Sequence, residues 1–319
     1  MGRLIAAIAL IFCLSPQLPL AAEVQYYPVP SGAGPHDVWP APDGTVWYTA
    51  QLQGALGRLD PKTGQIEQIP LGENSAPHGV TVGPDGAAWV TDSGQNAIVR
   101  VDPASKAVKR YKLPDGKGYA NLNTGVFDHA GVLWFTGQSG IYGRLDPKSG
   151  KLEVWDAPKG RGPYGITATA DGSIYYASLA GNHIARIDAN TGAATVIEPP
   201  TKRQGARRAW ADSKGRVWVS EWNSGQVSLY DPKTAQWRSW RAPGKSPSIY
   251  AVYVDDRGKV WLTDFDANRI LSFDPDTEQF QAFPSDRSGA NVRQLAGRPG
   301  EVWGAESGND RLVVVRYAP

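Results

Sequence analysis

An aromatic residue returns along this sequence at intervals of 41 to 45 residues, and this regular spacing is the feature that most constrains the fold. The series consists of Trp47, Trp89, Trp134, Tyr175, Trp218, Trp261 and Trp303. A fixed period of this length is typical of repeat architectures, in which each unit buries its hydrophobic face against its neighbours. The spacing therefore indicates seven structural units, and we expect the aromatic series to be part of the core.

Each unit reads as four short strands. A Gly turn comes before the alternating run around each aromatic residue, as in residues 83–92 (GPDGAAWVTD), and this pattern predicts a hairpin. A third run ends in an Asp turn, such as GRLDPKTG at 57–64, and a shorter fourth run follows. We therefore predict an all-β, seven-bladed β-propeller with four-stranded blades. A solenoid is the structural alternative, but its usual caps are absent from the sequence.

The two ends of the sequence complement each other. The seventh unit supplies three strands before Pro319, whereas residues 24–30 (VQYYPVP) form a lone strand ahead of the first unit. We expect this N-terminal strand to pair into the last blade, which closes the ring and removes its free edges. Ahead of it, Arg3, an apolar stretch and the small residues at 21–22 suggest a secretory signal, with an uncleaved anchor as the alternative. The predicted organisation is a signal peptide at 1–22 and one propeller domain at 23–319.

Composition limits the partners. Removal of the signal would also remove Cys13, the only cysteine, so the exported, periplasmic or secreted chain would have no disulfide and no thiol nucleophile. Lys and Arg number 33 against 31 Asp and Glu, and they are spread along the chain. This balance argues against a nucleic-acid partner. We expect a monomer without a transmembrane segment once the signal is removed.

The repeat also aligns the positions where the innermost strands begin. Eleven residues before each aromatic lie His36, His78, Asn123, Tyr164, Arg207, Tyr250 and Val292, all but one of them polar. Strand starts from every blade converge at one end of a propeller's channel. We therefore expect these residues to form a mouth that binds a small molecule or a cyclic peptide.

His36 and His78 occupy the same repeat position in neighbouring units, so they should face the same mouth. Paired imidazoles can act as a general base, a proton donor or metal ligands near neutral pH. The alternative is that both bond nearby loop backbone and only hold the rim. His129 and His183 lie off this position, and we expect both at the surface.

Acidic residues gather three positions after the aromatics. They are Asp92, Glu221, Asp264 and Glu306. Carboxylates at a mouth can bind Mg²⁺ or Ca²⁺, and we select Asp92 and Glu306 as candidate ligands. The same groups can instead pair with Arg207 or Arg293, or accept hydrogen bonds between blades.

The amino-acid sequence of these repeats resembles that of the streptogramin B (virginiamycin B) lyase family over residues 24–319. The likeness is carried by APHGVTVGPDGAAWVTD (76–92), GPYGITATADGSIYYAS (162–178) and GQSGIYGRLDPKSG (137–150). It implies a propeller that linearises a cyclic depsipeptide antibiotic by elimination with the help of Mg²⁺. In that case His78 would be the catalytic base, His36 a substrate-binding partner and Asp92 close to the place of a metal ligand. From the repeat register we add Asn123, Tyr164, Arg207 and Tyr250 as candidate substrate-binding residues.

Two departures from the family pattern keep other functions open. Ala76 stands where the family has a metal-binding Glu, and the histidine pair lies in the first two units rather than toward the end of the chain. The leading hypothesis is a metal-assisted carbon–oxygen lyase. The alternatives are a non-catalytic cell-envelope propeller that binds a ligand or protein, and a metal-dependent lactonase in which metal-bound water attacks a ring ester.

Overall fold

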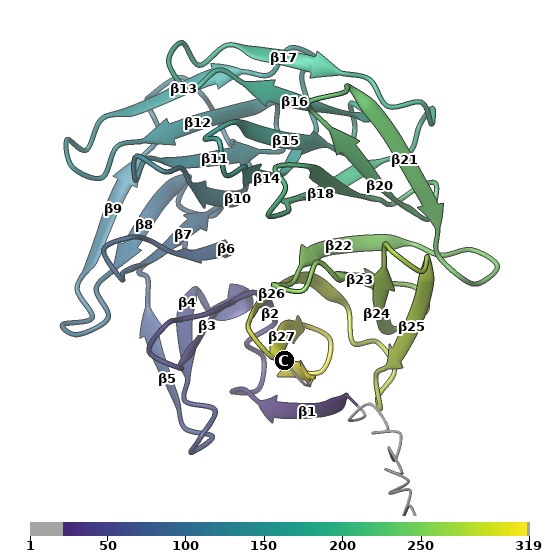
Figure 1. The fold of residues 1–319 in the computed structure, drawn as a ribbon. Helices are drawn as coiled ribbons and strands as arrows, with labels where there is room; N and C mark the ends of the chain where they lie inside the picture. The colour runs from purple at the N-terminus through teal and green to yellow at the C-terminus, as the bar shows by residue number, and fades with distance from the viewer. Residues whose placement is uncertain (1–21, 318–319) are drawn as a thin grey trace, which may run out of the picture.

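The computed structural model describes residues 22–317, which form seven four-stranded antiparallel sheets arranged around a central channel (Figure 1). The first three blades are β2 (Pro35–Pro40), β3 (Val46–Ala50), β4 (Ala55–Leu59) and β5 (Ile66–Pro70); β6 (Pro77–Val82), β7 (Ala88–Asp92), β8 (Ala97–Val101) and β9 (Val108–Lys112); and β10 (Leu122–Phe127), β11 (Leu133–Gly137), β12 (Ile141–Leu145) and β13 (Leu152–Asp156). The next three are β14 (Pro163–Ala168), β15 (Ile174–Ser178), β16 (His183–Ile187) and β17 (Ala194–Ile197); β18 (Ala206–Ala211), β19 (Val217–Glu221), β20 (Gln226–Asp231) and β21 (Gln236–Arg241); and β22 (Ile249–Val254), β23 (Val260–Asp264), β24 (Arg269–Asp274) and β25 (Gln279–Pro284). The seventh contains β26 (Val292–Arg298), β27 (Glu301–Glu306), β28 (Arg311–Arg316) and β1 (Glu23–Pro28). The predicted fold is confirmed.

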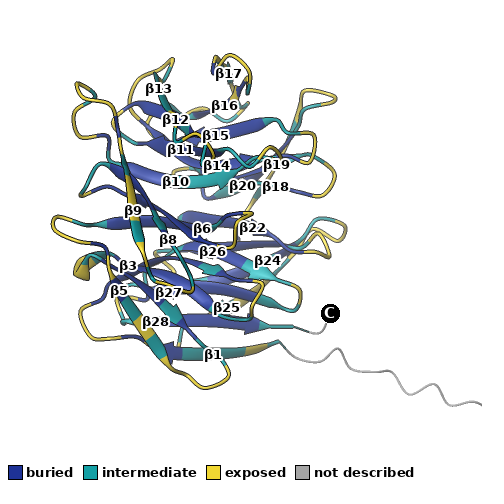
Figure 2. Ribbon diagram, turned by 90° about the vertical axis from the view of Figure 1, so that its left-hand side faces the viewer, coloured by how far each residue is buried: buried dark blue, intermediate teal, exposed yellow. Residues whose placement is uncertain are grey.

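Burial falls from the inside of each blade to its outside. The first three strands of a blade are mostly buried, whereas the outermost strand alternates between exposed and half-buried residues (Figure 2). The 3₁₀ turn η1 (Gln51–Gln53) is the helical element of residues 22–317. Over that range no helix is both long and apolar enough to cross a membrane. The predicted signal peptide, except for its last residue, lies outside the described residues.

The ring is closed by strands from the two ends of the chain. β1 pairs antiparallel with β28 from Glu23 opposite Arg316 to Pro28 opposite Arg311. The Asp310 carboxylate strengthens this junction, because it accepts hydrogen bonds from the backbone N–H groups of Gly32 (2.7 Å) and Gly34 (2.9 Å). The expected strand exchange is therefore present, and β1 completes the seventh blade as its outermost strand by covering the outer edge of β28.

The seven repeat aromatics are core residues, as the spacing predicts. Each is at most 2% exposed. They pack between neighbouring blades: Trp47 from blade 1 contacts the cluster of β6 to β8, and Trp303 from blade 7 contacts that of β2 and β3. Several indole N–H groups also find an acceptor in the preceding turn, as in Trp261 Nε1 to Asp255 (2.9 Å). Aromatic packing and satisfied N–H groups together explain why this position repeats.

A bulge interrupts the start of every innermost strand. In β2 the pairing with β3 shifts between Pro35 and Val38, and an equivalent shift occurs in the other six blades. A bulge adds an unpaired residue and re-aims the side chains beside it. It therefore turns the residues next to each strand start toward the channel.

Hydroxyl groups tie these bulges to the next blade. Thr49 Oγ1 accepts from the N–H of Asp37 (3.0 Å) and donates to the carbonyl of His78 in the next blade (2.9 Å). Thr91 makes the same pair of bonds with Gly79 N–H and the Asn123 carbonyl. Corresponding bonds to the next blade come from Thr136 and Ser220. These four hydroxyl residues, each two positions after a repeat aromatic, thus fix the backbone where the innermost strand of the next blade begins.

Candidate functional site

One residue from each blade forms a ring at the start of the innermost strands. Every member directly follows the residue that pairs with the end of the second strand. This mouth ring consists of His36, His78, Asn123, Tyr164, Arg207, Tyr250 and Arg293. Its first six members are those predicted from the repeat. The seventh prediction, Val292, is wrong by one residue, because β26 and β27 are joined by a shorter hairpin than the other blades and Val292 itself pairs with Glu306.

The two histidines are in direct contact, as their matching repeat positions predict. Their ring centroids are 4.0 Å apart, with an interplanar angle of 48°. His36 is 6% exposed and His78 is 5% exposed. Their imidazoles therefore contact each other in a nearly closed space, and a carboxylate lies beside them: His36 Nδ1 bonds Asp37 Oδ1 at 2.8 Å.

Asp37 also forms a buried ion pair across the channel. Arg208, from blade 5, places its two terminal nitrogens 3.0 and 3.3 Å from the oxygens of the Asp37 carboxylate in blade 1. Both side chains are at least 95% buried. Burial by itself would raise the pKa of Asp37, but Arg208 and the histidines outweigh it and hold the pKa well below its usual range. Asp37 is therefore a fixed anion that accepts from His36.

A directed chain of hydrogen bonds reaches the second histidine. Arg208 Nη1 donates to Thr124 Oγ1 (2.8 Å), and the Thr124 hydroxyl donates to Asn123 Oδ1 (2.7 Å). Asn123 Nδ2 then donates to His78 Nε2 at 3.1 Å. Because Arg208 can only donate, this chain runs in one direction and leaves the proton of neutral His78 on Nδ1. That nitrogen is buried and has no hydrogen-bond partner among the described residues.

Both histidines are held neutral. Burial lowers the pKa of His36, and the bond to Asp37 offsets part of this effect. Burial, followed by the neighbouring His36, lowers the pKa of His78 further, to well below its usual value. At neutral pH the pair thus offers a lone pair on His36 Nε2 and a proton on His78 Nδ1.

The opposite side of the mouth ring is built from arginine and aromatic rings. The Arg207 guanidinium lies 3.4 Å from the ring centroid of Tyr250 and 4.4 Å from that of Trp222. Phe265 continues this surface to Arg293, whose guanidinium is 5.3 Å from the Phe265 ring. No carboxylate within residues 22–317 forms a salt bridge with Arg207 or Arg293. Cation–π contact thus holds two positive charges at the rim.

Two tyrosines of the mouth ring, Tyr164 and Tyr250, contact each other through their hydroxyl groups. The hydroxyls of Tyr164 and Tyr250 are 2.5 Å apart, and Arg207 Nη2 donates to Tyr164 at 3.3 Å. Burial would raise the pKa of Tyr164, but Arg207 and Arg208 outweigh it and lower that pKa. Burial and the neighbouring Tyr164 raise the pKa of Tyr250. The two hydroxyls are therefore hydrogen-bonded to each other in the mouth ring, and either can be the donor.

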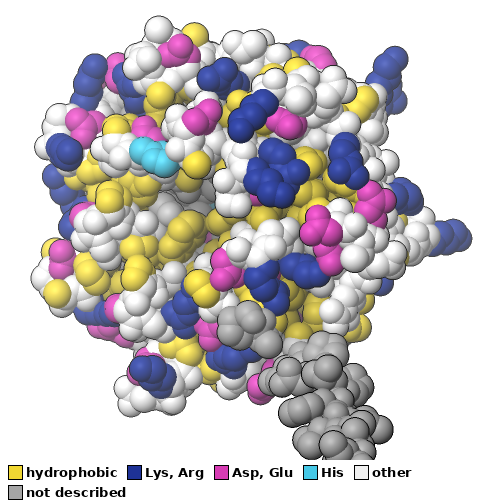
Figure 3. Space-filling view, in the orientation of Figure 1, with side chains coloured by type: hydrophobic (Ala, Val, Ile, Leu, Met, Phe, Trp, Pro, Cys, Tyr) yellow, Lys and Arg dark blue, Asp and Glu magenta, His cyan; other side chains and the backbone are white. Residues whose placement is uncertain are grey.

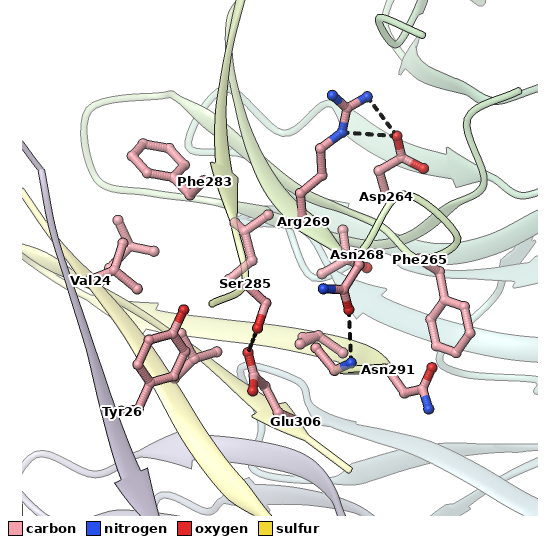
Figure 4. A pocket seen from close by; sticks show the side chains of 16 residues that line it. Val24, Tyr26, Asp264, Phe265, Asn268, Arg269, Phe283, Ser285, Asn291 and Glu306 are labelled. Carbon is pink, nitrogen blue, oxygen red and sulfur yellow. Dashed lines mark hydrogen bonds and ion pairs between the residues drawn. The ribbon is translucent and has the colours of Figure 1, made fainter. Parts of the chain in front are cut away.

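The predicted metal ligands lie apart from the histidines. The Asp92 carboxylate accepts from Ser75 Oγ (2.5 Å), Ala76 N (2.9 Å) and Gln95 N (3.0 Å), all in its own blade. Glu306 accepts from Ser285 and Arg311 beside a cavity of about 20 Å³ (Figure 4). That space holds about one water molecule. Asp92 and Glu306 therefore act as hydrogen-bond acceptors for nearby protein groups. Neither forms an ion pair with Arg207 or Arg293.

The donors at the histidines do not suit Mg²⁺ either. In the described part of the chain, the group that brings three potential ligands together is His36, Asp37 and His78, with ligand atoms within 4.8 Å of one another. Mg²⁺ prefers oxygen ligands, whereas this group offers two imidazoles and one carboxylate already engaged by Arg208. A guanidinium in contact with the only carboxylate also opposes a cation. The residues present therefore do not fit the Mg²⁺ that the family resemblance implies.

The remaining histidines have different surroundings. His129 is exposed, as predicted, and its Nε2 bonds the Thr169 carbonyl. The expectation for His183 is wrong: it is only 1% exposed, because it begins β16 and packs beside Tyr176. Both of its ring nitrogens are buried without a partner in the described residues. Burial lowers the pKa of His183, so this residue is a neutral part of the core.

Asp37, Arg208 and Thr124 are functional candidates that the repeat alignment did not select. They occupy the position directly after the mouth ring, and the bulge brings both positions to the channel. The sequence did contain a signal for them, because all three are polar residues at the position directly after a mouth-ring residue. Fold and site together define a seven-bladed propeller whose blades each contribute to a polar ring at one end of the channel.

Comparison with known proteins assigns this propeller to a family. The model of the virginiamycin B lyase family matches residues 16–238, and the chain belongs to that family. A search of curated proteins gave no match.

Solved structures agree on the fold. Virginiamycin B lyase from Staphylococcus aureus superimposes with a TM-score of 0.86 at 19% identity, covering 93% of this chain and 100% of the enzyme. A streptogramin B lyase structure gives 0.85 at 21% identity, covering 93% and 98%. The extracellular domain of a putative hybrid two-component system from B. thetaiotaomicron gives 0.71 at 14% identity, covering 91% of this chain and 40% of that one. At such identities these matches show the fold.

Proposed function

We propose that this protein is a carbon–oxygen lyase that opens a cyclic depsipeptide or a related cyclic ester by elimination. The observation that carries the proposal is the buried pair of neutral histidines, one of them held by a carboxylate. Membership of the virginiamycin B lyase family supports the reaction class. The aromatic and arginine half of the mouth ring supplies a surface for the substrate.

The base in this proposal is His36. Its Nδ1 proton is held by Asp37, so the lone pair lies on Nε2 and the ring orientation is fixed. A carboxylate on the far nitrogen also stabilises the imidazolium that forms when the base takes a proton. His78 has no such partner, since its Nε2 accepts from Asn123. The geometry therefore favours exchanging the roles that the family resemblance implies for the two histidines.

The reaction is balanced without water. His36 Nε2 takes the proton from the carbon next to a carbonyl, the electron pair forms a carbon–carbon double bond, and the adjacent bond to the ester oxygen breaks. The ester leaves as a carboxylate, so the ring opens without a change of mass. His78 Nδ1–H donates a hydrogen bond to the oxygen on which negative charge develops, which lowers the barrier in a water-poor site.

The test is incubation of the protein with a type B streptogramin, followed by mass spectrometry in ¹⁸O-labelled water. Elimination gives a ring-opened product of unchanged mass and no label. His36→Ala should reduce turnover by about 10²–10⁴-fold, the range for loss of a general base. His129→Gln, at the exposed histidine, is the matched control and should retain full turnover. Incorporated label would instead indicate the lactonase, and full activity of His36→Ala would refute the role of His36.

A non-catalytic binding propeller is the second candidate. The observation in its favour is that the acids expected to hold a metal already accept hydrogen bonds from nearby protein groups, Asp92 from Ala76 N and Glu306 from Ser285. Sensor-type extracellular domains also share the fold. A ligand that co-purifies with the protein and dissociates unchanged would support this function, whereas any conversion of the ligand would exclude it.

A further inference from the structure

We propose that the channel holds a second binding site, on the far side of the Asp37–Arg208 ion pair from the mouth ring, for a small neutral ring compound that carries a carbonyl. The cavity lies along the innermost strands and has a volume of about 180 Å³. None of the mouth-ring residues lines it; its polar end starts at the next position, with Asp37 and Arg208. It is therefore separate from the proposed catalytic histidines.

The size and the walls of the cavity suit one aromatic ring. An engineered apolar cavity of about 150 Å³ is known to take up benzene. Here Trp39 and Trp210 face each other with ring centroids 6.3 Å apart, and Val80 and Val126 add apolar surface. Both tryptophans are only half-buried. A planar ring that enters would thus gain apolar contact that the tryptophans lack in the free protein.

One polar atom at the cavity's end is left without an acceptor. Arg208 is 4% exposed and its terminal nitrogens bond Asp37 and Thr124, but its Nε–H is buried and unpaired among the described residues. The side-chain amide of Gln294, which also lines this end, is already hydrogen-bonded through both its oxygen and its nitrogen. A buried donor without a partner is costly. A ligand acceptor that reaches Arg208 Nε would remove that cost.

The charge at this end favours a neutral acceptor over an anion. The Asp37 carboxylate lies against the same guanidinium and cancels its charge. An anionic ligand would therefore lose its hydration and meet a carboxylate, whereas a carbonyl oxygen accepts the Nε–H bond without that repulsion. The ligand class that follows is a neutral aromatic or alicyclic carbonyl compound.

A ligand can reach this region from outside the protein. The cavity extends to the last residues of the innermost strands, including Ala168 at the end of β14 and Ala211 at the end of β18. In Figure 3 the centre of the displayed face is hollowed, and hydrophobic side chains surround the hollow. The described residues thus leave the channel open to small molecules at an end of the propeller.

The experiment compares three probes of similar size by saturation-transfer NMR and tryptophan fluorescence with the full chain. Acetophenone has a ring and a carbonyl, toluene lacks the carbonyl, and benzoate carries a charge. We expect saturable binding of acetophenone, with toluene and benzoate each at least about tenfold weaker. Toluene cannot accept the hydrogen bond to the charged Arg208, which contributes at least this much, and benzoate would lose its hydration beside the Asp37 carboxylate. Benzoate that binds as tightly as acetophenone, or no saturable binding of any probe at millimolar concentration, would overturn the proposal.

A blocking variant locates the site. Ala168→Phe places a large side chain in the lining and should abolish acetophenone binding, while the ion pair stays intact. Ala104→Phe, in an exposed turn far from the channel lining, is the control and should bind like the original protein. Circular dichroism and thermal unfolding check that both variants fold. Equal binding by the two variants would show that the probe binds elsewhere and would refute the cavity as the site.

Discussion

The two halves of the mouth ring use different chemistry at equivalent repeat positions. On one side, His36 and His78 are buried, neutral and adjustable by pH, and Asp37 and Asn123 fix their protons. On the other side, the guanidinium groups of Arg207 and Arg293 lie against aromatic rings, with no carboxylate partner in residues 22–317. One backbone position thus presents neutral imidazoles on one half and guanidinium groups packed against aromatic rings on the other. The repeat fixes where a side chain is presented, and the residue type decides what it does.

The largest expected effect is that of removing the Asp37 carboxylate, the anion beside the two histidines. Asp37→Asn leaves the buried Arg208 guanidinium unpaired, and we expect a loss of about 3–5 kcal/mol in the free energy of unfolding, measured in urea. Glu278→Gln, at the exposed pair with Arg238, is the control and should change stability by less than about 1 kcal/mol. Adding Arg208→Met to Asp37→Asn should recover part of the loss. An unchanged urea midpoint for Asp37→Asn would show that the pair is not closed in solution.

A smaller effect is expected from the hydroxyls that hold both halves in place. Thr91→Val keeps the side-chain shape but leaves Gly79 N–H and the Asn123 carbonyl without this partner, so we expect a loss of about 1–3 kcal/mol. Thr195→Val, on the exposed side of the outermost strand β17, is the matched control. If the two variants unfold at the same urea concentration, the hydroxyl bonds between blades contribute no stability.

Acidification should lower the free energy of unfolding through the three buried histidines. The folded protein keeps His36, His78 and His183 neutral, since burial lowers the pKa of each, whereas the unfolded chain takes up protons near the usual value of 6.5. Stability should therefore be full above about pH 6.5 and fall as the pH drops below it, toward the folded-state pKa values, by at most about 1.4 kcal/mol per pH unit for each histidine. Asp37 adds its own loss only below its usual pKa of 3.8. Urea midpoints at pH 7.5, 6.0 and 5.0 test this, and His78→Gln should flatten the dependence.

The smallest expected effect is that of metal removal. Since the donors around His36 and His78 do not suit Mg²⁺, we expect EDTA and added Mg²⁺ to leave the proposed elimination rate unchanged within experimental error. The same assay with His36→Ala defines the background. A rate that falls with EDTA and returns with Mg²⁺ would show that other residues bind the ion and would restore the metal-assisted form of the proposal.

Sequence periodicity was sufficient for the fold and for six members of the mouth ring. It placed His36 beside His78 because blade geometry repeats with the aromatic series. It missed Arg293 because one shorter hairpin shifts the count, and it misjudged His183 because burial at the start of β16 depends on packing between strands. Asp37 and Arg208 were missed for another reason: they are 171 positions apart, and their pairing across the channel depends on side-chain directions set by the bulges.

The pairing of β1 with β28 also determines when the ring can close during synthesis of the protein. Among the strands of residues 22–317, the one that completes the seventh blade is synthesised first, while its partner β28 is synthesised last. The circle can therefore close only after every strand between β1 and β28 has been synthesised, and until then β1 lacks its partner strand. Loss of a few residues from β28 would remove its pairing with β1. We expect this loss to destabilise the whole propeller, because the ring of seven blades is closed by that pairing.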